Sequence, residues 1–176
     1  MSRQIKNIIA ITVFLICIGL INVAGQNIEI EIRGMNAFTF ILIIAVLLQV
    51  IFFIPSFLLK TEKYYDLVGS LTYITTISLA YFSVENKTMI DSIIYFYVMV
   101  WALRLGIYLF RRVRNDGKDV RFEKAKRHFF WFLQYWMGQA LWVSLTACAA
   151  IIAILSPEED TLPVFCLLYT SDAADD

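Results

Sequence analysis

Histidine, cysteine and charge are all scarce in this sequence of 176 residues. His128 is the only histidine, which excludes the multi-histidine metal clusters of membrane desaturases and hydroxylases, because each metal needs several imidazole or carboxylate ligands. The three cysteines form no pattern that predicts a disulfide framework or a thiol motif. The formal net charge is zero. We therefore expect neither a bound metal nor a nucleic-acid partner.

The low charge goes with a high apolar content. Charged residues make up 17% of the chain and hydrophobic residues 60%, whereas soluble domains have about 25% and about 45–50%. Five apolar runs are long enough to cross a hydrocarbon core, which takes about 20 residues. We expect each run to be a helix, because lipid offers no hydrogen-bond partner to backbone N–H and C=O groups. The predicted fold is an all-α, polytopic transmembrane helix bundle, with spans at residues 5–24, 37–59, 67–84, 90–110 and 129–155.

The loops predict how the bundle is oriented. Residues 1–7, 60–66 and 111–128 hold 12 of the 15 lysines and arginines, whereas the opposite loops hold only Arg33 and Lys87. By the positive-inside rule, the amino terminus and the two basic loops face the cytoplasm. We expect an integral membrane protein of the bacterial inner membrane or the endoplasmic reticulum, in contact with membrane lipids.

The last residues differ in character from the rest. The string CLLYTSDAADD resembles translated read-through of a sequencing adapter, and a short acidic tail is the alternative. We interpret residues 1–164 as a partial transmembrane helical domain and residues 165–176 as a non-native tail.

The fourth span carries a cation well inside its apolar run. Arg104 lies about two turns, or roughly 10 Å, from the basic end of the span. An ionisable residue at such depth indicates function, and a structural arginine that snorkels or pairs with backbone carbonyls is the alternative. Tyr97, Arg104, Tyr108 and Arg111 share one helix face by their spacing. Guanidinium groups suit phosphate or carboxylate, while an interfacial aromatic belt explains Tyr108 and Arg111 equally well.

The basic loop after this span is a second candidate site. Residues 111–128 combine eight cations with three acids and Gly117, which permits a tight bend flanked by Lys118 and Arg121. A phosphate-bearing cofactor would suit this turn. Fixing the topology or holding anionic lipid explains the same cations.

The third span offers a candidate proton donor. Asp66, Ser70 and Tyr73 lie at i, i+4 and i+7 and share a face. A carboxylate below a tyrosine is a plausible arrangement for acid catalysis, and a helix-capping aspartate with a packed tyrosine is the alternative.

Four polar or helix-breaking positions interrupt the other apolar runs. Gln49 and Pro55 indicate a kink around a polar cavity in the second span. Gln134 and Gln139 in the fifth span need hydrogen-bond partners, and bonding between helices is the role we predict for both.

Two blocks, YYDLVGSLTY and WALRLG followed by GKDVRF, resemble membrane proteins of the DUF1295 family, which are relatives of steroid 5-alpha-reductases. The resemblance covers the second to the fifth span. It implies a bundle of the seven-helix type that reduces a conjugated carbon–carbon double bond in a lipid-like or steroid-like substrate, with NADPH as cofactor. By position, Arg104 resembles an arginine that helps line the cofactor–substrate cavity in the reductases.

The sequence also departs from the reductase pattern. Pro55-Ser56 resembles the end of a Gln-Glu-Leu-Pro-Ser motif, but 52–54 read Phe-Phe-Ile here, so the usual carbonyl-polarising pair is replaced. Asp66 and Tyr73 are the proposed substitutes. The nucleotide signature built around Arg-His-Pro is missing, and we expect that the chain as given does not bind NADPH properly.

The resulting hypothesis is an NADPH-dependent membrane reductase with Tyr73 and Asp66 as catalytic residues. Its cofactor-binding residues would be Arg104, Tyr108, Arg111, Lys118 and Arg121. An isoprenylcysteine-type membrane methyltransferase and a non-enzymatic lipid-binding scaffold are the alternatives. An Arg-His-Pro block with a later glutamate in the uninterrupted reading frame would favour an enzyme, and its absence would favour the scaffold.

Overall fold

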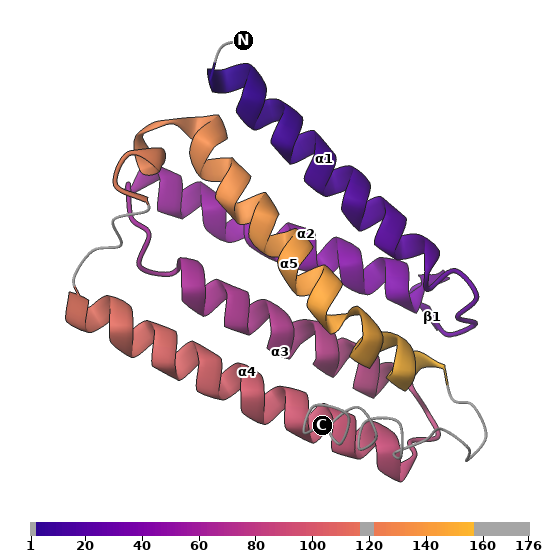
Figure 1. Cartoon of the computed structure of the whole chain (residues 1–176). Helices are drawn as coiled ribbons and strands as arrows, with labels where there is room; N and C mark the ends of the chain where they lie inside the picture. Colours follow the sequence, from indigo (N-terminus) through magenta and orange to yellow (C-terminus); the bar gives the residue numbers. More distant parts are fainter. Residues whose placement is uncertain (1–2, 117–121, 157–176) are drawn as a thin grey trace, which may run out of the picture.

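The computed structural model is an all-α bundle of long helices (Figure 1). The structure describes residues 3–116 and 122–156, with side chains described up to residue 112 in the first of these segments. Every predicted span is a helix, and each end lies within a few residues of its predicted position except that the fourth helix extends further into the basic loop. The helices are α1 (Arg3–Val23), α2 (Ala37–Leu58), α3 (Tyr65–Ser83), α4 (Met89–Asp116) and α5 (Phe129–Leu155), with a short 3-10 helix η2 (Ala125–Arg127).

A small hairpin joins the first two helices. Strands β1 (Glu31–Ile32) and β2 (Met35–Asn36) pair antiparallel, and Gly34 at their turn has a φ of 75°, which glycine adopts without steric cost. Asn36 then caps α2, because its Oδ1 accepts from the backbone N–H of Thr39 at 3.0 Å. Its Nδ2 donates to the carbonyls of Gly25 and Ile28 at 3.1 and 2.8 Å. One side chain therefore fixes the connection between α1 and α2.

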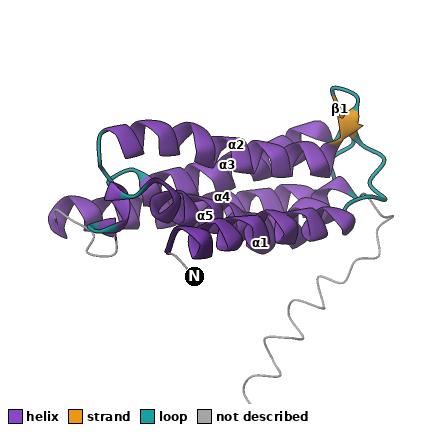
Figure 2. Ribbon diagram, turned by 90° about the horizontal axis from the view of Figure 1, so that it is seen from above, coloured by secondary structure: helices purple, strands orange, loops and turns teal. Residues whose placement is uncertain are grey.

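The helices alternate in direction along the bundle (Figure 1). The start of α1, the α2–α3 loop and η2 lie at one end, and β1 projects from the opposite end (Figures 1 and 2). Among the described residues, the loops predicted to share a side of the membrane therefore share an end of the molecule. Which end faces the cytoplasm stays a prediction.

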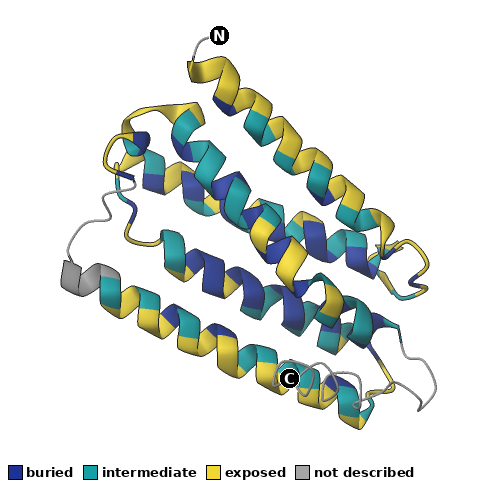
Figure 3. Cartoon of the chain, in the orientation of Figure 1, coloured by how far each residue is buried: buried dark blue, intermediate teal, exposed yellow. Residues whose placement is uncertain are grey.

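Four helices, α1, α2, α4 and α5, are long and apolar enough to cross a membrane, and the chain is an integral membrane protein. The third predicted span, α3, is a helix, but its most apolar stretch of spanning length is less apolar than those of the other four helices. Its buried face carries hydroxyl groups, including Ser70, Thr72 and Thr76, and it packs against α2, α4 and α5. Figure 3 shows the contrast with α1, whose surface is largely exposed. A helix enclosed by others needs less apolar surface than one that faces lipid.

Two glycines let α3 approach its neighbours closely. A Cβ at Gly106 of α4 would collide with the side chain of Ser70, and a Cβ at Gly69 of α3 would collide with the amide of Gln139. Small residues at such positions are what allows transmembrane helices to pack.

We predict that Gly106→Ala destabilises the bundle, because the added methyl group meets the Ser70 hydroxyl. Over-packing typically costs about 1–3 kcal/mol, which lowers the midpoint of thermal unfolding by roughly 2–12 °C for a chain of this size. The measurement is a thermal melt of the purified protein in detergent. Gly19→Ala is the matched control, since a Cβ there has nothing within 4 Å. Equal midpoints for the two variants would contradict the packing assigned to Gly106.

Candidate functional site

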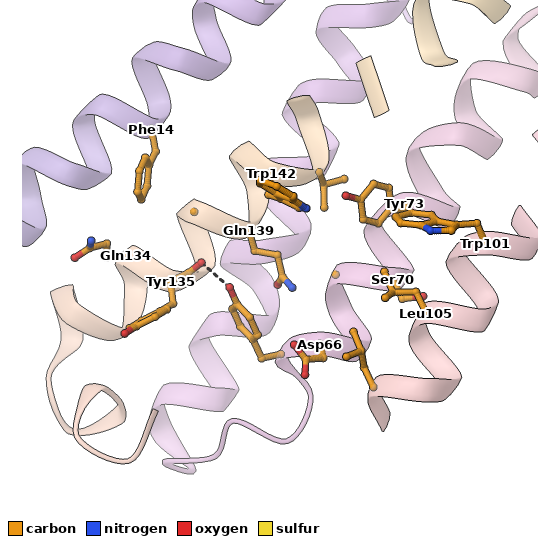
Figure 4. Close-up of a pocket in the computed structure, with 15 residues that line it drawn as sticks. Phe14, Asp66, Ser70, Tyr73, Trp101, Leu105, Gln134, Tyr135, Gln139 and Trp142 are labelled. Atoms are coloured by element: carbon orange, nitrogen blue, oxygen red, sulfur yellow. Dashed lines mark hydrogen bonds between the residues drawn. The ribbon is translucent and has the colours of Figure 1, made fainter. Parts of the chain in front are cut away.

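A cleft of about 600 Å³ opens between α3, α4 and α5, with Phe14 of α1 at its edge (Figure 4). This volume is in the range of sites for small molecules. Its walls combine aromatic and apolar side chains with a short row of polar groups. The polar and glycine positions are Asp66, Gly69, Ser70, Gln134, Gly138 and Gln139, and the remaining ones are Phe14, Tyr65, Tyr73, Trp101, Leu105, Leu109, Tyr135, Trp142 and Val143.

The stripe predicted on the third span forms the floor of this cleft. Asp66, Ser70 and Tyr73 all line it, as their common helix face requires. The structure therefore brings the two predicted catalytic residues into one cleft, about two turns apart on α3. Their catalytic roles stay a prediction.

Tyr73 is held by neighbours from two other helices. Its ring is only 4% exposed and lies edge-on to Trp101 of α4, with 4.9 Å between ring centroids. Its hydroxyl is hydrogen-bonded to Oγ1 of Thr146 in α5. Thr146 has a single hydroxyl hydrogen, which it donates to the carbonyl of Trp142 at 2.7 Å. The phenol is therefore the donor in the Tyr73–Thr146 bond.

Asp66 lies at the basic-loop end of the cleft. Its Oδ2 accepts from the guanidinium of Arg112 at 3.2 Å, and its side chain is 13% exposed. The N-cap of α3 is Tyr64, which makes no side-chain capping bond, so Asp66 is not the capping residue that we considered as the alternative. An acid in the first turn still interacts favourably with the helix dipole. The arrangement ties the start of α3 to the end of α4.

Ser70 and Gln139 occupy the middle of the floor. The Ser70 hydroxyl donates to the carbonyl of Ala102 at 2.6 Å, so its hydrogen is used within the protein. The Gln139 amide lies against the backbone of Gly69. Its Oε1 is buried without a hydrogen-bond partner among the described residues, so the bond between helices predicted for this glutamine is not seen there.

Gln49 of α2 has a different environment. It is fully buried, and its Nε2 donates to Oγ1 of Thr72 in α3 at 2.9 Å. The predicted polar cavity around Gln49 and Pro55 is not seen among the described cavities, because neither residue lines the cleft or the smaller groove between α1 and α2. Gln49 instead links α2 to α3.

The predicted cofactor residues lie elsewhere. Arg104, Tyr108 and Arg111 share a face of α4 as their spacing predicts, and all three are exposed. The cleft is lined by a different face of this helix, which carries Trp101, Leu105 and Leu109. Arg104 does not line the described cleft, and it has no hydrogen bond or ion pair with the described residues. Lys118 and Arg121 lie outside the described residues.

Several residues in or beside the cleft were not singled out in the sequence. Trp101, Trp142 and Thr146 come from α4 and α5, and their approach to Tyr73 depends on how three helices pack. Spacing along one helix predicts which residues share a face, but not which face meets which neighbour. The residues that the structure describes include no group of three or more histidines, cysteines or acids that could hold a metal.

Comparison with known proteins gives one match. A family model described as "Protein of unknown function (DUF1295)" matches residues 52–170, which is more than half of the chain. Neither the curated proteins nor the solved structures include a match.

The exposure of the two faces of α4 can be tested with nitroxide spin labels. After replacement of the native cysteines by serine, we predict that a label at Tyr108→Cys is mobile and accessible to oxygen dissolved in the bilayer. Ala102 is fully buried, so a label at Ala102→Cys should be immobilised and shielded. Power-saturation electron paramagnetic resonance measures both properties. A shielded label at position 108 would mean that protein covers the Arg104 face.

Proposed function

The chain belongs to the DUF1295 family, and from this premise we propose that it is an integral-membrane reductase of the steroid 5-alpha-reductase type. Its substrate would be lipid-like or steroid-like, and its reaction the NADPH-dependent reduction of a conjugated carbon–carbon double bond. The observation that carries the proposal is the position of a tyrosine hydroxyl, Tyr73, inside a cleft within a bundle of apolar helices.

The lining of the cleft suits such a substrate. Trp101, Leu105 and Val143 offer apolar and aromatic surface, and burial of an apolar ligand there contributes about 25 cal/mol per Å². Trp101 and Trp142 are also exposed at the outer surface of the bundle, at 46% and 63%. Because few residues of α4 contact α5, the cleft opens between these two helices, and a membrane-dissolved molecule would reach it without crossing water.

Tyr73 would polarise the carbonyl conjugated to the double bond. A phenol is a donor that stays protonated at neutral pH. In the described arrangement its hydrogen is directed at Thr146, and rotation of the O–H bond would direct it at a carbonyl oxygen in the cleft instead. Thr146 would then hold the ring position and receive the hydrogen bond again after the product leaves. Such a positioned acid contributes about 10²–10⁴-fold to a rate.

Asp66 would act at a distance from this group. Seven residues along α3 correspond to roughly 10 Å, so Asp66 and Tyr73 do not touch the same atom. With its partner Arg112, Asp66 would instead hold the end of the cleft nearest the basic loops and connect it to solvent protons.

Among the described residues, none of the predicted phosphate ligands lines this cleft. Arg104 and Arg111 lie on the face of α4 that adjoins the one carrying Trp101 and Leu105, and Lys118 and Arg121 lie outside the described residues. NADPH is implied by the family resemblance alone. We therefore assign no step of the reaction to it.

A non-enzymatic lipid-binding role is the second candidate, and one observation favours it. The hydrogens of Ser70 and Tyr73 are donated within the protein, and Asp66 is paired with Arg112. The cleft at rest therefore presents hydrogen-bond acceptors rather than a free acid, which suits the binding of a lipid as well as its reduction.

The first test of the proposal is the variant Tyr73→Phe. We predict that it lowers the rate of enone reduction by about 10²–10⁴-fold, because the phenol no longer polarises the carbonyl. The assay follows NADPH absorbance and the reduced product of an enone lipid with the full-length protein. Tyr81→Phe is the matched control, since Tyr81 lies two turns further along α3 and its hydroxyl contacts Ser92 rather than the cleft. A wild-type rate for Tyr73→Phe would exclude its role as the donor.

The second test addresses the cofactor. For the full-length protein we predict that Arg104→Ala abolishes NADPH binding while membrane insertion is retained, because the guanidinium would pair with a phosphate. Titration of the purified variant measures the affinity, and Lys87→Ala, at the opposite end of the bundle, is the control. Unchanged affinity would show that Arg104 is not a phosphate ligand.

A further inference from the structure

The Gln139 amide is a polar group of the cleft whose buried oxygen the fold leaves unpaired. Its Oε1 is shielded from solvent and has no partner among the described residues, and no hydrogen bond of its Nε2 to them is seen. Figure 4 shows the side chain extending from α5 toward α3, into the space between Asp66 and Trp142. An unpaired amide in an apolar environment costs about 1–3 kcal/mol by mutational data.

The position of this amide is fixed by the fold. Gly69 on α3 leaves room for it, since any Cβ there would collide with Nε2 and the amide carbon. Bonding between helices is not seen for Gln139 among the described residues, whereas the fully buried Gln49 makes such a bond through its Nε2 to Thr72 at 2.9 Å and leaves only its own Oε1 unpaired, outside the cleft. The bundle thus holds one glutamine as a link between helices and presents another to the cleft.

The neighbours of Gln139 define what would satisfy it. Ser70 has donated its hydrogen to Ala102, and Tyr73 has donated its hydrogen to Thr146. Asp66 is an ion-paired carboxylate, which can only accept. These three neighbours therefore offer no hydrogen to Gln139 Oε1, and a ligand group that donates a hydrogen is required there. A hydroxyl meets this requirement and can also accept from the amide Nε2, whereas a ketone or an ether can only accept.

We propose that the cleft recognises a lipid that bears a hydroxyl group, and that Gln139 is the specificity-determining residue that binds this hydroxyl. Rotation about the last side-chain torsion, which is broad for glutamine, presents either end of the amide to the cleft. The inference rests on the proposed function only in taking the cleft as the substrate site. Because Gly69 lies four residues before Tyr73, the hydroxyl would lie roughly 6 Å along α3 from the carbonyl that Tyr73 polarises.

The test is a binding titration without NADPH, so that it does not depend on catalysis. The probes are a long-chain alcohol, the ketone and the methyl ether of the same chain length, and the alkane. Each probe competes with a brominated chain that quenches the fluorescence of Trp101 and Trp142, which both line the cleft. We expect the wild-type protein to bind the alcohol roughly 3- to 10-fold more tightly than the ketone or the ether, as one hydrogen bond predicts.

Gln139→Leu should remove this preference while the alkane binds as before. Its thermal midpoint should not fall, because the amide it removes has no partner in the described bundle. Gln49→Leu is the matched control, and it should keep the preference for the alcohol, because Gln49 lies outside the cleft.

Two outcomes would overturn the inference. One is a wild-type protein that binds the ketone as tightly as the alcohol, which decides the question even where a variant does not fold. The other is a Gln139→Leu variant that keeps the alcohol preference. Failure of the reductase proposal would appear differently, as alcohol binding that is intact in a protein that reduces no enone.

Discussion

The close packing of α3 against α4 and α5 is the constraint on which the rest of the structure depends. It is possible because Gly106 leaves space for Ser70 and Gly69 leaves space for Gln139. Once the helices are this close, the Ser70 hydroxyl reaches the carbonyl of Ala102 across the interface. The cleft then forms where α4 and α5 diverge from each other on either side of α3. The same glycines that join the bundle therefore define the floor of the site.

This packing also governs where the polar groups of α3 are satisfied. Thr72 donates to its own helix and accepts from Gln49, and Tyr73 bonds across to α5. In hydrocarbon each such group needs a partner inside the protein, so α3 can carry this many hydroxyl groups only because α2, α4 and α5 pack around it. Its polar face is a consequence of its central position. The groups left without a partner beside that face, chiefly the Gln139 amide of α5, are those available to a ligand.

Run length and spacing predict much of this fold and part of the site. Each apolar run of about 20 residues is a helix, and Asp66, Ser70 and Tyr73 line one cleft as their spacing requires. Spacing also places Arg104 and Tyr108 on one face of α4, but it does not say whether that face is enclosed. In a soluble helix the apolar stripe marks the buried side. In a membrane helix both the lipid-facing and the bundle-facing sides are apolar, so this guide is lost. Pairs such as Tyr73 with Thr146 depend on that missing information.

Any catalytic role of this chain depends on how the two faces of α4, one lining the cleft and one exposed, lie relative to each other. Trp101 and Leu105 line the cleft, while Arg104 and Tyr108 face outward. Arg104 follows Trp101 by three residues, so the two faces adjoin along α4 rather than lying on opposite sides of the helix. A dinucleotide with its phosphate at Arg104 would therefore reach a substrate beside Tyr73 along the edge of α4 that carries Trp101. The Asp66–Arg112 pair would then close the end of the cleft nearest the basic loops. In that arrangement Asp66 serves to hold the junction, and the chemistry falls to Tyr73.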